Sequence, residues 1–480
     1  MADRNLQLPG NPRYQPKDLQ PYFGYDNLYR GAVVVELAAL SVLIDHELIP
    51  QECHGQIVDA MESLMSITTT EVDRIEREVT RHDVRALVRC IQERLPEDLR
   101  RWVHVLLTSY DVLDTARALT VRRAHEEDVE PKLKLALSQF KDLIVEYADV
   151  PQVGRTHGQH AIPITVGFWL ATVASRLLHS TKRASRAARR LVGKASGPVG
   201  AHNAAVLFGL PTFQEELLKK LRIEPAPIST QIVPPEPLAE YLFACLECSA
   251  ALGQFGRDCR NLMRTEIGEV VEAFEEGQVG SSTMAHKRNP INFESLEGMW
   301  QRSRAEFGKV LETLISEHQR DLTGSAPLRD TPIMVVNLVQ QLNTLLRADK
   351  QGRTFLSRIR IDREACERNL RLQGNRLAAE AAYIGLQFHG YAGDAHELVN
   401  RELTPVLGTQ ADATLWELLE ARAETTDPAL REPLAKFSEA QQDVLLNVPP
   451  TQYIGNAAHQ ARLVAGKIAL WTREPICPME

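Results

Sequence analysis

Among the long stretches of this 480-residue sequence that lack proline, two indicate where long helices can lie. One stretch lies between Pro163 and Pro198, the other between Pro237 and Pro290. Because a proline inside a helix costs about 3 kcal/mol, long helices can run in such gaps. The second gap predicts a helix through 238–274, longer than the usual range of about 8–20 residues. A helix of this length buries its apolar surface in a bundle, to which partner subunits can contribute.

Strand signals are weak throughout the chain. Alternating β-branched and polar residues do not recur at strand spacing, so the sequence predicts an all-α fold. The distribution of long-helix stretches and helix breakers divides this fold into three helical zones. We expect an N-terminal helical domain over 1–116, a central long-helix bundle domain over 117–370 and a C-terminal helical domain over 371–480.

Composition excludes several classes of protein. Hydrophobic residues make up 44% of the chain and the net charge is −8, which is incompatible with wholesale disorder. Aromatic residues are only 6% and acidic side chains outnumber basic ones, so a nucleic-acid surface is disfavoured. The sequence contains no run of about 18 apolar residues, so we expect no membrane helix. The first residues lack the apolar core of a signal peptide, so we expect a cytoplasmic protein.

The seven cysteines are scattered and odd in number, which is typical of free thiols in a reducing compartment. Cys245 and Cys248 form a C-x-x-C pair that could be redox-active or bind a metal. They lie in an apolar helical pattern with no second pair nearby, so we interpret them as buried hydrophobic residues. Neither a metal nor an organic cofactor is expected from the sequence.

One segment, Gly280–Pro290, concentrates reactive side chains. As a surface turn between helices, it would use its glycine and hydroxyls for capping and leave its basic residues solvated. As a functional loop, its Gly-Ser-Ser start would let backbone N–H groups converge on an anion. Residue types and spacing alone do not decide between these two interpretations.

The same segment resembles the signature loop of the fumarase/aspartase superfamily, G-S-S-x-M-P-x-K-x-N-P, with Ala285 in place of the usual proline. Three further segments, 80–84, 102–116 and 154–161, resemble motifs of its adenylosuccinate lyase family in the same order. The resemblance implies a fumarase/aspartase-like fold and elimination of fumarate from succinylated purine nucleotides. The implied reactions, in purine biosynthesis, convert adenylosuccinate to AMP and SAICAR to AICAR.

Such an elimination needs a base for a weakly acidic C–H, an acid for the leaving nitrogen and cations for the carbanion. The resemblance makes Ser281 the base and His157 the acid. Lys287 would stabilise the carbanion, and Glu294 would orient a histidine or Lys287. His82 is implied as a supporting member of the catalytic set.

Substrate contacts carry over by the same resemblance. Two arginines and a serine near residue 320 are suited to phosphate recognition because guanidinium groups bind phosphate oxygens in pairs. The implied substrate-binding residues are Arg13, Tyr14, Arg81, His82, Asp83, His104, Thr108, Ser109, Gln231, Asn289, Arg320, Ser325 and Arg329.

Two departures concern the substrate rather than the chemistry. After Gln231 the family often has Q-R-D-R-H-A-x-Y, whereas segment 234–241 of this chain lacks both arginines and the histidine. Tyr110 is bulkier than the small residue commonly found in T-S-x-D. Alternatives therefore stay open: another fumarate-releasing C–N lyase, a 3-carboxymuconate-type cycloisomerase, or a helical assembly protein without activity. The resemblance also implies a homotetramer whose active sites each take motifs from three subunits.

Overall fold

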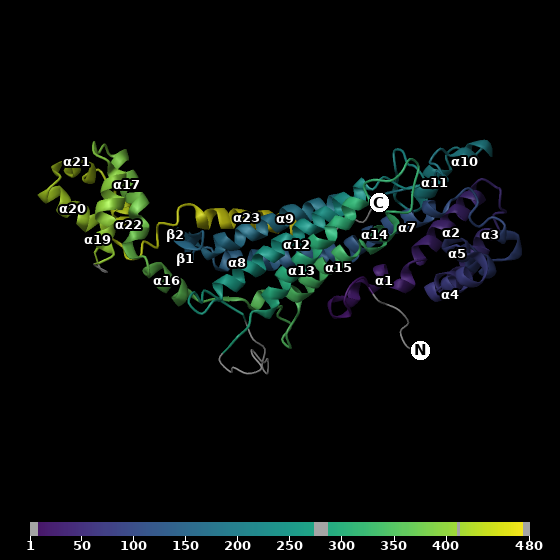
Figure 1. The fold of residues 1–480 in the computed structure, drawn as a ribbon, viewed down its shortest axis with the longest axis horizontal. Helices are drawn as coiled ribbons and strands as arrows, with labels where there is room; N and C mark the ends of the chain where they lie inside the picture. The colour runs from purple at the N-terminus through teal and green to yellow at the C-terminus, as the bar shows by residue number, and fades with distance from the viewer. Residues whose placement is uncertain (1–7, 273–286, 410–412, 474–480) are drawn as a thin grey trace.

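The computed structural model describes residues 8–272, 287–409 and 413–473. These residues form an elongated molecule in which a central helical bundle separates two smaller ends (Figure 1). The predicted all-α class is confirmed, since the strands within the described ranges form only three two-stranded sheets. None of the helices in these ranges is both long enough and apolar enough to cross a membrane.

The bundle packs long helices around an aromatic core. Phe255 lies at its centre, with ring centroids 5.0 Å from Phe140 and 6.0 Å from Phe293. Burying each such ring contributes about 1.5–3 kcal/mol. Gly256 allows two of the helices to touch, because a Cβ there would lie 2.5 Å from the Phe293 carbonyl oxygen. The helices of this region are α8 (Glu130–Glu146), α9 (Val166–Arg189), α12 (Glu236–Leu262), α13 (Ile291–Glu312), α14 (Ser325–Asp330), α15 (Ile333–Leu346) and α23 (Ala457–Arg473).

Both proline-free stretches contain the expected long helix. Helix α9 begins where the Thr165 hydroxyl accepts a hydrogen bond from the Phe168 N–H at 3.1 Å. Helix α12 starts at Glu236, two residues before the predicted start, but the prediction of a helix through 238–274 is wrong at its C-terminal end. The helix stops at Leu262, whose carbonyl accepts the Glu269 N–H at 2.9 Å across a turn that contains Gly268 at φ +65°.

The N-terminal end consists of shorter helices around α2, which packs against α3, α7 and α11. The helices here are α1 (Gln20–Phe23), α2 (Arg30–Asp45), α3 (Cys53–Met65), α4 (Thr69–Ile75), α5 (Asp83–Arg94), α6 (Glu97–Arg100), α7 (Ser109–Ala124), α10 (Asn203–Leu207) and α11 (Phe213–Lys220). Helix α7 is long and runs from this end into the bundle (Figure 1).

The C-terminal end has a hydrophobic core of its own, formed by residues between 378 and 445. Trp416 and Phe437 contact each other there at 5.5 Å between ring centroids. The last helix, α23, instead returns to pack on α8 and α9 of the bundle. The helices of this end are α16 (Arg363–Arg371), α17 (Ala379–Phe388), α18 (Ala395–Glu397), α19 (Thr404–Leu407), α20 (Leu415–Thr425), α21 (Arg431–Leu434) and α22 (Glu439–Leu446).

The sequence did not predict the six strands that the described ranges contain. The longest pair, β1 (Pro151–Thr156) and β2 (Gln159–Thr165), forms an antiparallel hairpin. The other strands have two residues each and pair as β3 with β4 and β5 with β6, which cannot produce a periodic signal. Their bounds are Val192–Gly193 (β3), Glu224–Pro225 (β4), Val270–Val271 (β5) and Arg360–Ile361 (β6).

The six cysteines in the described ranges are free and buried. Burial raises the pKa of the Cys245 thiol to about 12 and that of Cys248 well above its usual range. The interpretation of this pair as buried hydrophobic residues of α12 is confirmed. Within the described ranges, no group of three or more His, Cys, Asp and Glu side chains could hold a metal ion.

Candidate active site

The segment that bears the reactive loop is described only in part. Ser281 lies outside the described residues. Lys287 is exposed and Asn289 half-buried in the stretch directly before α13, and Glu294 lies exposed in the first turn of that helix. The α13 segment is held by Glu272, whose buried carboxylate accepts a hydrogen bond from the Asn292 amide. Burial raises the pKa of Glu272.

His157 occupies the tip of the β1–β2 hairpin. It forms a two-residue turn with Gly158, and both residues have positive φ, +53° and +76°. This geometry matches the turn that best follows the right-handed twist of two strands. Gly158 takes it without strain, and histidine tolerates it better than most residues. The imidazole is therefore presented at an exposed tip, away from the bundle core.

Three of the implied substrate-binding residues meet at the other end of the bundle. The Arg320 guanidinium donates to Gln231 Oε1 at 3.0 Å and to Ser325 Oγ at 3.4 Å. Its Cζ also lies 3.2 Å from the ring centroid of Tyr110, whose hydroxyl is 3.2 Å from Ser325 Oγ. We call Tyr110, Gln231, Arg320 and Ser325 the arginine cluster.

A second group lies at the start of α5. Arg329 forms an ion pair with Asp83 at 3.2 Å, so the C-terminal end of α14 meets the first turn of α5. His82 is the N-cap of α5, and its Nδ1 lies 3.4 Å from Asp83 Oδ1. These three implied residues are brought together, and Arg329 and His82 remain largely exposed. A pair of cationic and imidazole groups at a helix N-terminus is suited to anions.

His104 is oriented by a buried acid that the sequence did not reveal. Glu36 on α2 is fully buried, and its carboxylate accepts the His104 backbone N–H at 3.0 Å. The other carboxylate oxygen lies 2.6 Å from His104 Nδ1. This contact leaves Nε2 as the ring nitrogen free to meet a ligand.

Thr108 and Ser109 begin α7, where a buried ion pair holds their backbone. Asp111 accepts the Thr108 N–H at 2.7 Å, and its carboxylate also contacts the Lys194 ammonium. Both charged side chains are fully buried. The N–H of loop residue Gly197 donates a hydrogen bond to the Asp111 carboxylate at 3.2 Å, and its carbonyl accepts one from the Lys194 ammonium at 3.2 Å. Breaking such a pair leaves an uncompensated buried charge, so the start of α7 is rigidly defined.

The remaining implied residues have no such partners among the contacts described. Arg13 and Tyr14 lie in a short 3-10 turn, Pro12–Tyr14, where the Tyr14 ring faces the guanidinium of Arg302 at 5.9 Å. Arg81 is exposed and has φ +54°. The structure does not join these three residues to the arginine cluster.

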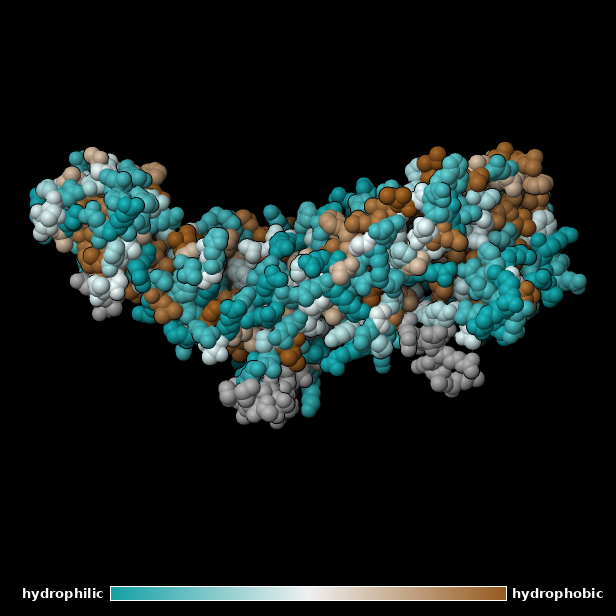
Figure 2. All heavy atoms as spheres, viewed as in Figure 1, coloured by the Kyte–Doolittle hydropathy of each residue, from teal (hydrophilic) through white to brown (hydrophobic). Residues whose placement is uncertain are grey.

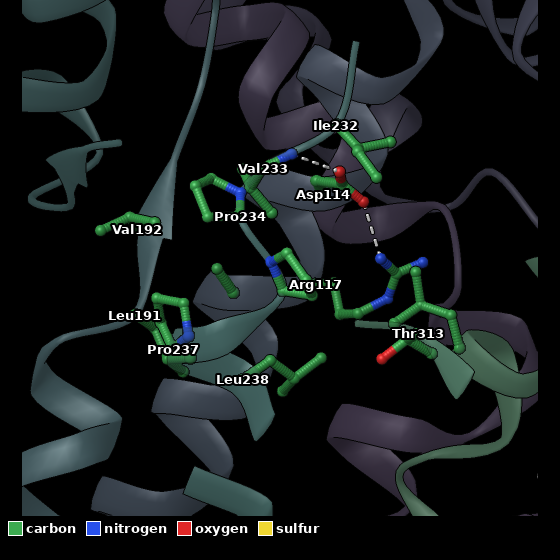
Figure 3. Close-up of a pocket in the computed structure, with 13 residues that line it drawn as sticks. Asp114, Arg117, Leu191, Val192, Ile232, Val233, Pro234, Pro237, Leu238 and Thr313 are labelled. Carbon is green, nitrogen blue, oxygen red and sulfur yellow. Dashed lines mark hydrogen bonds and ion pairs between the residues drawn. The ribbon is translucent and has the colours of Figure 1, made fainter. Parts of the chain in front are cut away.

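An apolar cavity lies where the family pattern would place arginines. Prolines 234, 235 and 237 line it together with Leu191, Val192 and Leu328. Figure 3 shows Pro234, Pro237, Leu191 and Val192 among the lining side chains. The polar groups that face it are paired: Asp114 accepts from Arg117 at 2.7 Å and from the Val233 N–H at 3.1 Å. Burial raises the pKa of Asp114.

Comparison with known proteins decides the family. A family model described as lyase matches residues 25–303. Adenylosuccinate lyase from Archaeoglobus fulgidus is 34% identical over 396 residues, covering 81% of this chain and 85% of that protein. The Pyrococcus horikoshii adenylosuccinate lyase is 33% identical over 453 residues, covering 93% and 94%. The chain belongs to the fumarase/aspartase superfamily of lyases.

Solved structures agree with this lyase fold. The 3-carboxy-cis,cis-muconate lactonizing enzyme of Pseudomonas putida superposes with a TM-score of 0.76 at 24% identity, covering 96% of this chain and 98% of that one. A fumarate lyase from a Mesorhizobium species gives 0.76 at 21% identity, covering 95% and 100%. At these identities the likeness concerns the fold. The curated relatives make the protein a carbon–nitrogen lyase.

The implied site residues of this lyase fall into separate places within one chain. Figure 1 shows β1 and β2 at the end of the bundle next to the C-terminal helices, whereas α7 and α14 lie toward the opposite end. The segment before α13 lies between them. His157 therefore does not meet the arginine cluster within a single chain.

Four residues with clear roles in this geometry escaped the sequence interpretation. Tyr110 was noted only as a departure, yet it covers the Arg320 guanidinium. Glu36, Lys194 and Glu269 are buried charges that hold His104, the start of α7 and the β1–β2 hairpin. Their signal is weak because each acts across more than 60 residues of sequence.

Proposed function

We propose that this lyase eliminates fumarate from succinylated purine nucleotides, converting adenylosuccinate to AMP and SAICAR to AICAR. The arginine cluster is the observation that carries the proposal. It gathers a guanidinium, an amide and two hydroxyls at one end of the bundle, with Gln231, Arg320 and Ser325 half-buried, a donor set suited to a phosphate monoester. The names of the curated relatives support the same substrate class.

The arginine cluster is preorganised for an anion. Because Gln231 and Ser325 already orient the guanidinium, less side-chain entropy is lost when a phosphate binds. Tyr110 stacks on the face of Arg320, whose Nε also donates to the Asp321 carbonyl at 3.1 Å, so one N–H on each of Nη1 and Nη2 remains for in-plane contacts with a ligand. Arg329, which forms an ion pair with Asp83, adds a second cation at the neighbouring helix end.

In the proposed reaction Ser281 removes the proton beside a substrate carboxylate. Positive charge from Lys287, with the Asn289 amide as a further donor, stabilises the carbanion that forms. The C–N bond then breaks, and His157 donates a proton to the leaving nitrogen. His82 and His104 orient the substrate, and Glu294 orients a histidine or Lys287.

We propose that the active enzyme is a homotetramer in which three subunits complete each site. Two features support this. His157, Lys287 and Arg320 lie at separate places of one chain, where the first two are exposed and Arg320 is half-exposed. Apolar surface is also available for contacts: Val206, Leu207 and Phe208 are exposed by 59%, 78% and 72% at and beside α10, where Figure 2 shows a hydrophobic area.

A second candidate is a C–N lyase that acts on a different succinyl-amine. The apolar cavity favours it, because three prolines stand where the family often has cationic residues close to the substrate. Such a wall does not contribute charge to a polyanionic ligand. A cycloisomerase is less well supported, since the muconate enzyme shares the fold at only 24% identity.

The two candidates are separated by a substrate panel. Purified enzyme is mixed with adenylosuccinate, SAICAR and other N-succinyl amines, and fumarate release is followed by absorbance, with Ser281→Ala as the inactive control. We expect turnover of the two nucleotides. Fumarate release from other succinyl-amines, without turnover of either nucleotide, would overturn the nucleotide proposal and support the second candidate.

A further inference from the structure

Glu269 is a fully buried carboxylate whose two oxygens are both occupied. The Arg155 guanidinium donates to Oε1 at 2.5 Å and to Oε2 at 3.0 Å, a bidentate pair. The Gln152 amide adds a hydrogen bond to Oε2 at 2.7 Å, and the Asn369 amide adds one to Oε1 at 2.7 Å. A planar, doubly hydrogen-bonded pair of this kind fixes both position and orientation.

The partners of Glu269 come from different parts of the fold. Gln152 and Arg155 belong to β1, whereas Asn369 belongs to α16. The Glu269 backbone is held as well: its N–H donates to Leu262 at the end of α12, and its carbonyl accepts the Asp362 N–H at 3.0 Å. The hairpin is therefore tied to the bundle and to α16 through one side chain.

Arg155 lies on β1, two residues before His157, which is in the turn that follows the strand. Beyond it, the chain reaches the exposed turn of Thr156, His157 and Gly158, where an added Cβ on the glycine would meet nothing within 4 Å. Below it, Val153 packs into a small hydrophobic cluster with Leu370 and Leu377, both from the region of α16. The pair between Arg155 and Glu269 is thus the last anchored point before the tip.

We propose that Glu269 is a positioning residue for His157: through Arg155 it holds the hairpin tip in the orientation needed to protonate the leaving nitrogen. The inference rests on the proposed function, in which His157 is the proton donor. Glu269 does not touch substrate. Small displacements of a catalytic group are costly, since about 1 Å of misplacement can lower a rate about 100-fold.

Charge as well as position depends on the pair. His160 of β2 lies opposite Arg155 in the hairpin register, and its pKa is lowered by burial and by Arg155 but raised by Glu269. Cys366 of α16 faces the same pair, and burial and Glu269 raise its pKa. Neutralising Glu269 leaves the Arg155 cation uncompensated beside the hairpin, which disfavours protonated imidazole there.

The test compares Glu269→Gln, which keeps size but removes charge, with Glu402→Gln as a matched control. Glu402 pairs with Arg422 at 2.5 Å on the surface of the C-terminal end, away from every implied site residue. In Glu269→Gln we expect kcat to fall about 10–100-fold while KM changes less than about 3-fold, as for loss of an interaction made in the transition state. The alkaline limb of the kcat profile moves to lower pH. Glu402→Gln leaves all three quantities at wild-type values.

A second variant separates charge from position. In Glu269→Gln with Arg155→Gln, neither charge remains, so we expect the alkaline limb to return toward its wild-type pH while kcat stays low. Hydrogen–deuterium exchange of peptides that cover 151–165 reports the hairpin without any substrate. We expect faster exchange there in both Glu269 variants and unchanged exchange in Glu402→Gln.

Each outcome either supports or contradicts the proposed role of Glu269. Wild-type kcat and an unmoved alkaline limb in Glu269→Gln would overturn the proposal, as would a loss of activity that matches only a loss of folded protein. If the wild type cleaves a different succinyl-amine, the same series is run with that compound. Faster hairpin exchange with a lower kcat on that compound would support the role of Glu269 although the nucleotide proposal had failed.

Discussion

The two ends of the bundle organise polar side chains in opposite ways. At one end, Arg320 is held in place by Gln231 and Ser325, and these three side chains are half-exposed and accessible to a ligand. At the other end, the charged pair of Arg155 and Glu269 lies inside the protein, and the residue it supports is exposed without a described partner side chain.

This difference separates binding from reaction. A binding end can be assembled within one chain because a phosphate needs only donors in a fixed arrangement. A reacting group is more effective once neighbouring subunits enclose it, because water is then excluded and electrostatic interactions in the site are stronger. In the proposed tetramer, the hairpin tip would be brought to the arginine cluster of another subunit.

The largest effect tests the exposed tip. His157→Gln removes the proposed proton donor, so we expect kcat to fall about 100- to 10,000-fold with little change in KM. Fumarate release from adenylosuccinate measures both constants. Mixing this variant with Ser281→Ala under conditions of subunit exchange should restore part of the activity, because some mixed sites then contain both native groups.

Two results would break the comparison of the ends. Near-normal kcat in His157→Gln would show that the tip does not supply the proton. A failure of mixing to restore activity, in tetramers proven to be mixed by mass spectrometry, would show that one chain completes its own site.

The next effect concerns the buried support of the binding end. Lys194→Met strands the Asp111 carboxylate in a site where both side chains are fully buried. We expect the free energy of unfolding to fall by about 3–5 kcal/mol. Denaturant unfolding measures it, with Lys220→Met as the control. Lys220 pairs with Asp45 at 2.6 Å on the surface, and its loss should cost less than about 1 kcal/mol. Equal losses in the two variants would contradict the assigned role of the buried pair.

Much of the fold could be predicted because its long helices are determined by residues that are close together in the sequence. The proline-free gaps located α9 and α12, and helix period and capping act within a few residues. The end of α12 could not be predicted in this way. It depends on Glu269, which leaves the helical path to meet Arg155, 114 residues earlier in the chain. Tertiary pairing overrode local preference there.

The residues of the candidate site also divide into those that local sequence predicted and those that depend on tertiary contacts. Motif resemblance named Gln231, Arg320 and Ser325, and the structure brings these three together. Motif resemblance gave no indication of Glu36 or Lys194, because a buried charge is identified only by the partner that the fold supplies. Ser281 lies outside the described residues, so its role stays a prediction.

A smaller effect sharpens the binding end. Arg320→Ala removes the guanidinium that Gln231 and Ser325 orient, and a hydrogen bond to a charged group contributes about 1.5–3 kcal/mol. We expect KM for adenylosuccinate to rise about 10- to 100-fold and kcat to change much less. Arg401→Ala, which removes an exposed arginine paired with Glu397, is the control and should leave KM unchanged. A fall in kcat with unchanged KM would assign Arg320 to the reaction instead.

The smallest effect concerns His160 and tests whether the hairpin end carries an electrostatic cost. Its pKa lies below the ordinary value of 6.5, because burial and the Arg155 cation disfavour the protonated ring. As pH falls through 6.5, the unfolded chain therefore binds this proton first, and the free energy of unfolding decreases until the folded protein is protonated too. We expect His160→Gln to remove that part of the pH dependence, so that its stability relative to wild type improves below this window. Denaturant unfolding at a series of pH values measures the difference, and parallel curves for the two proteins would show that the buried pair leaves this histidine unperturbed.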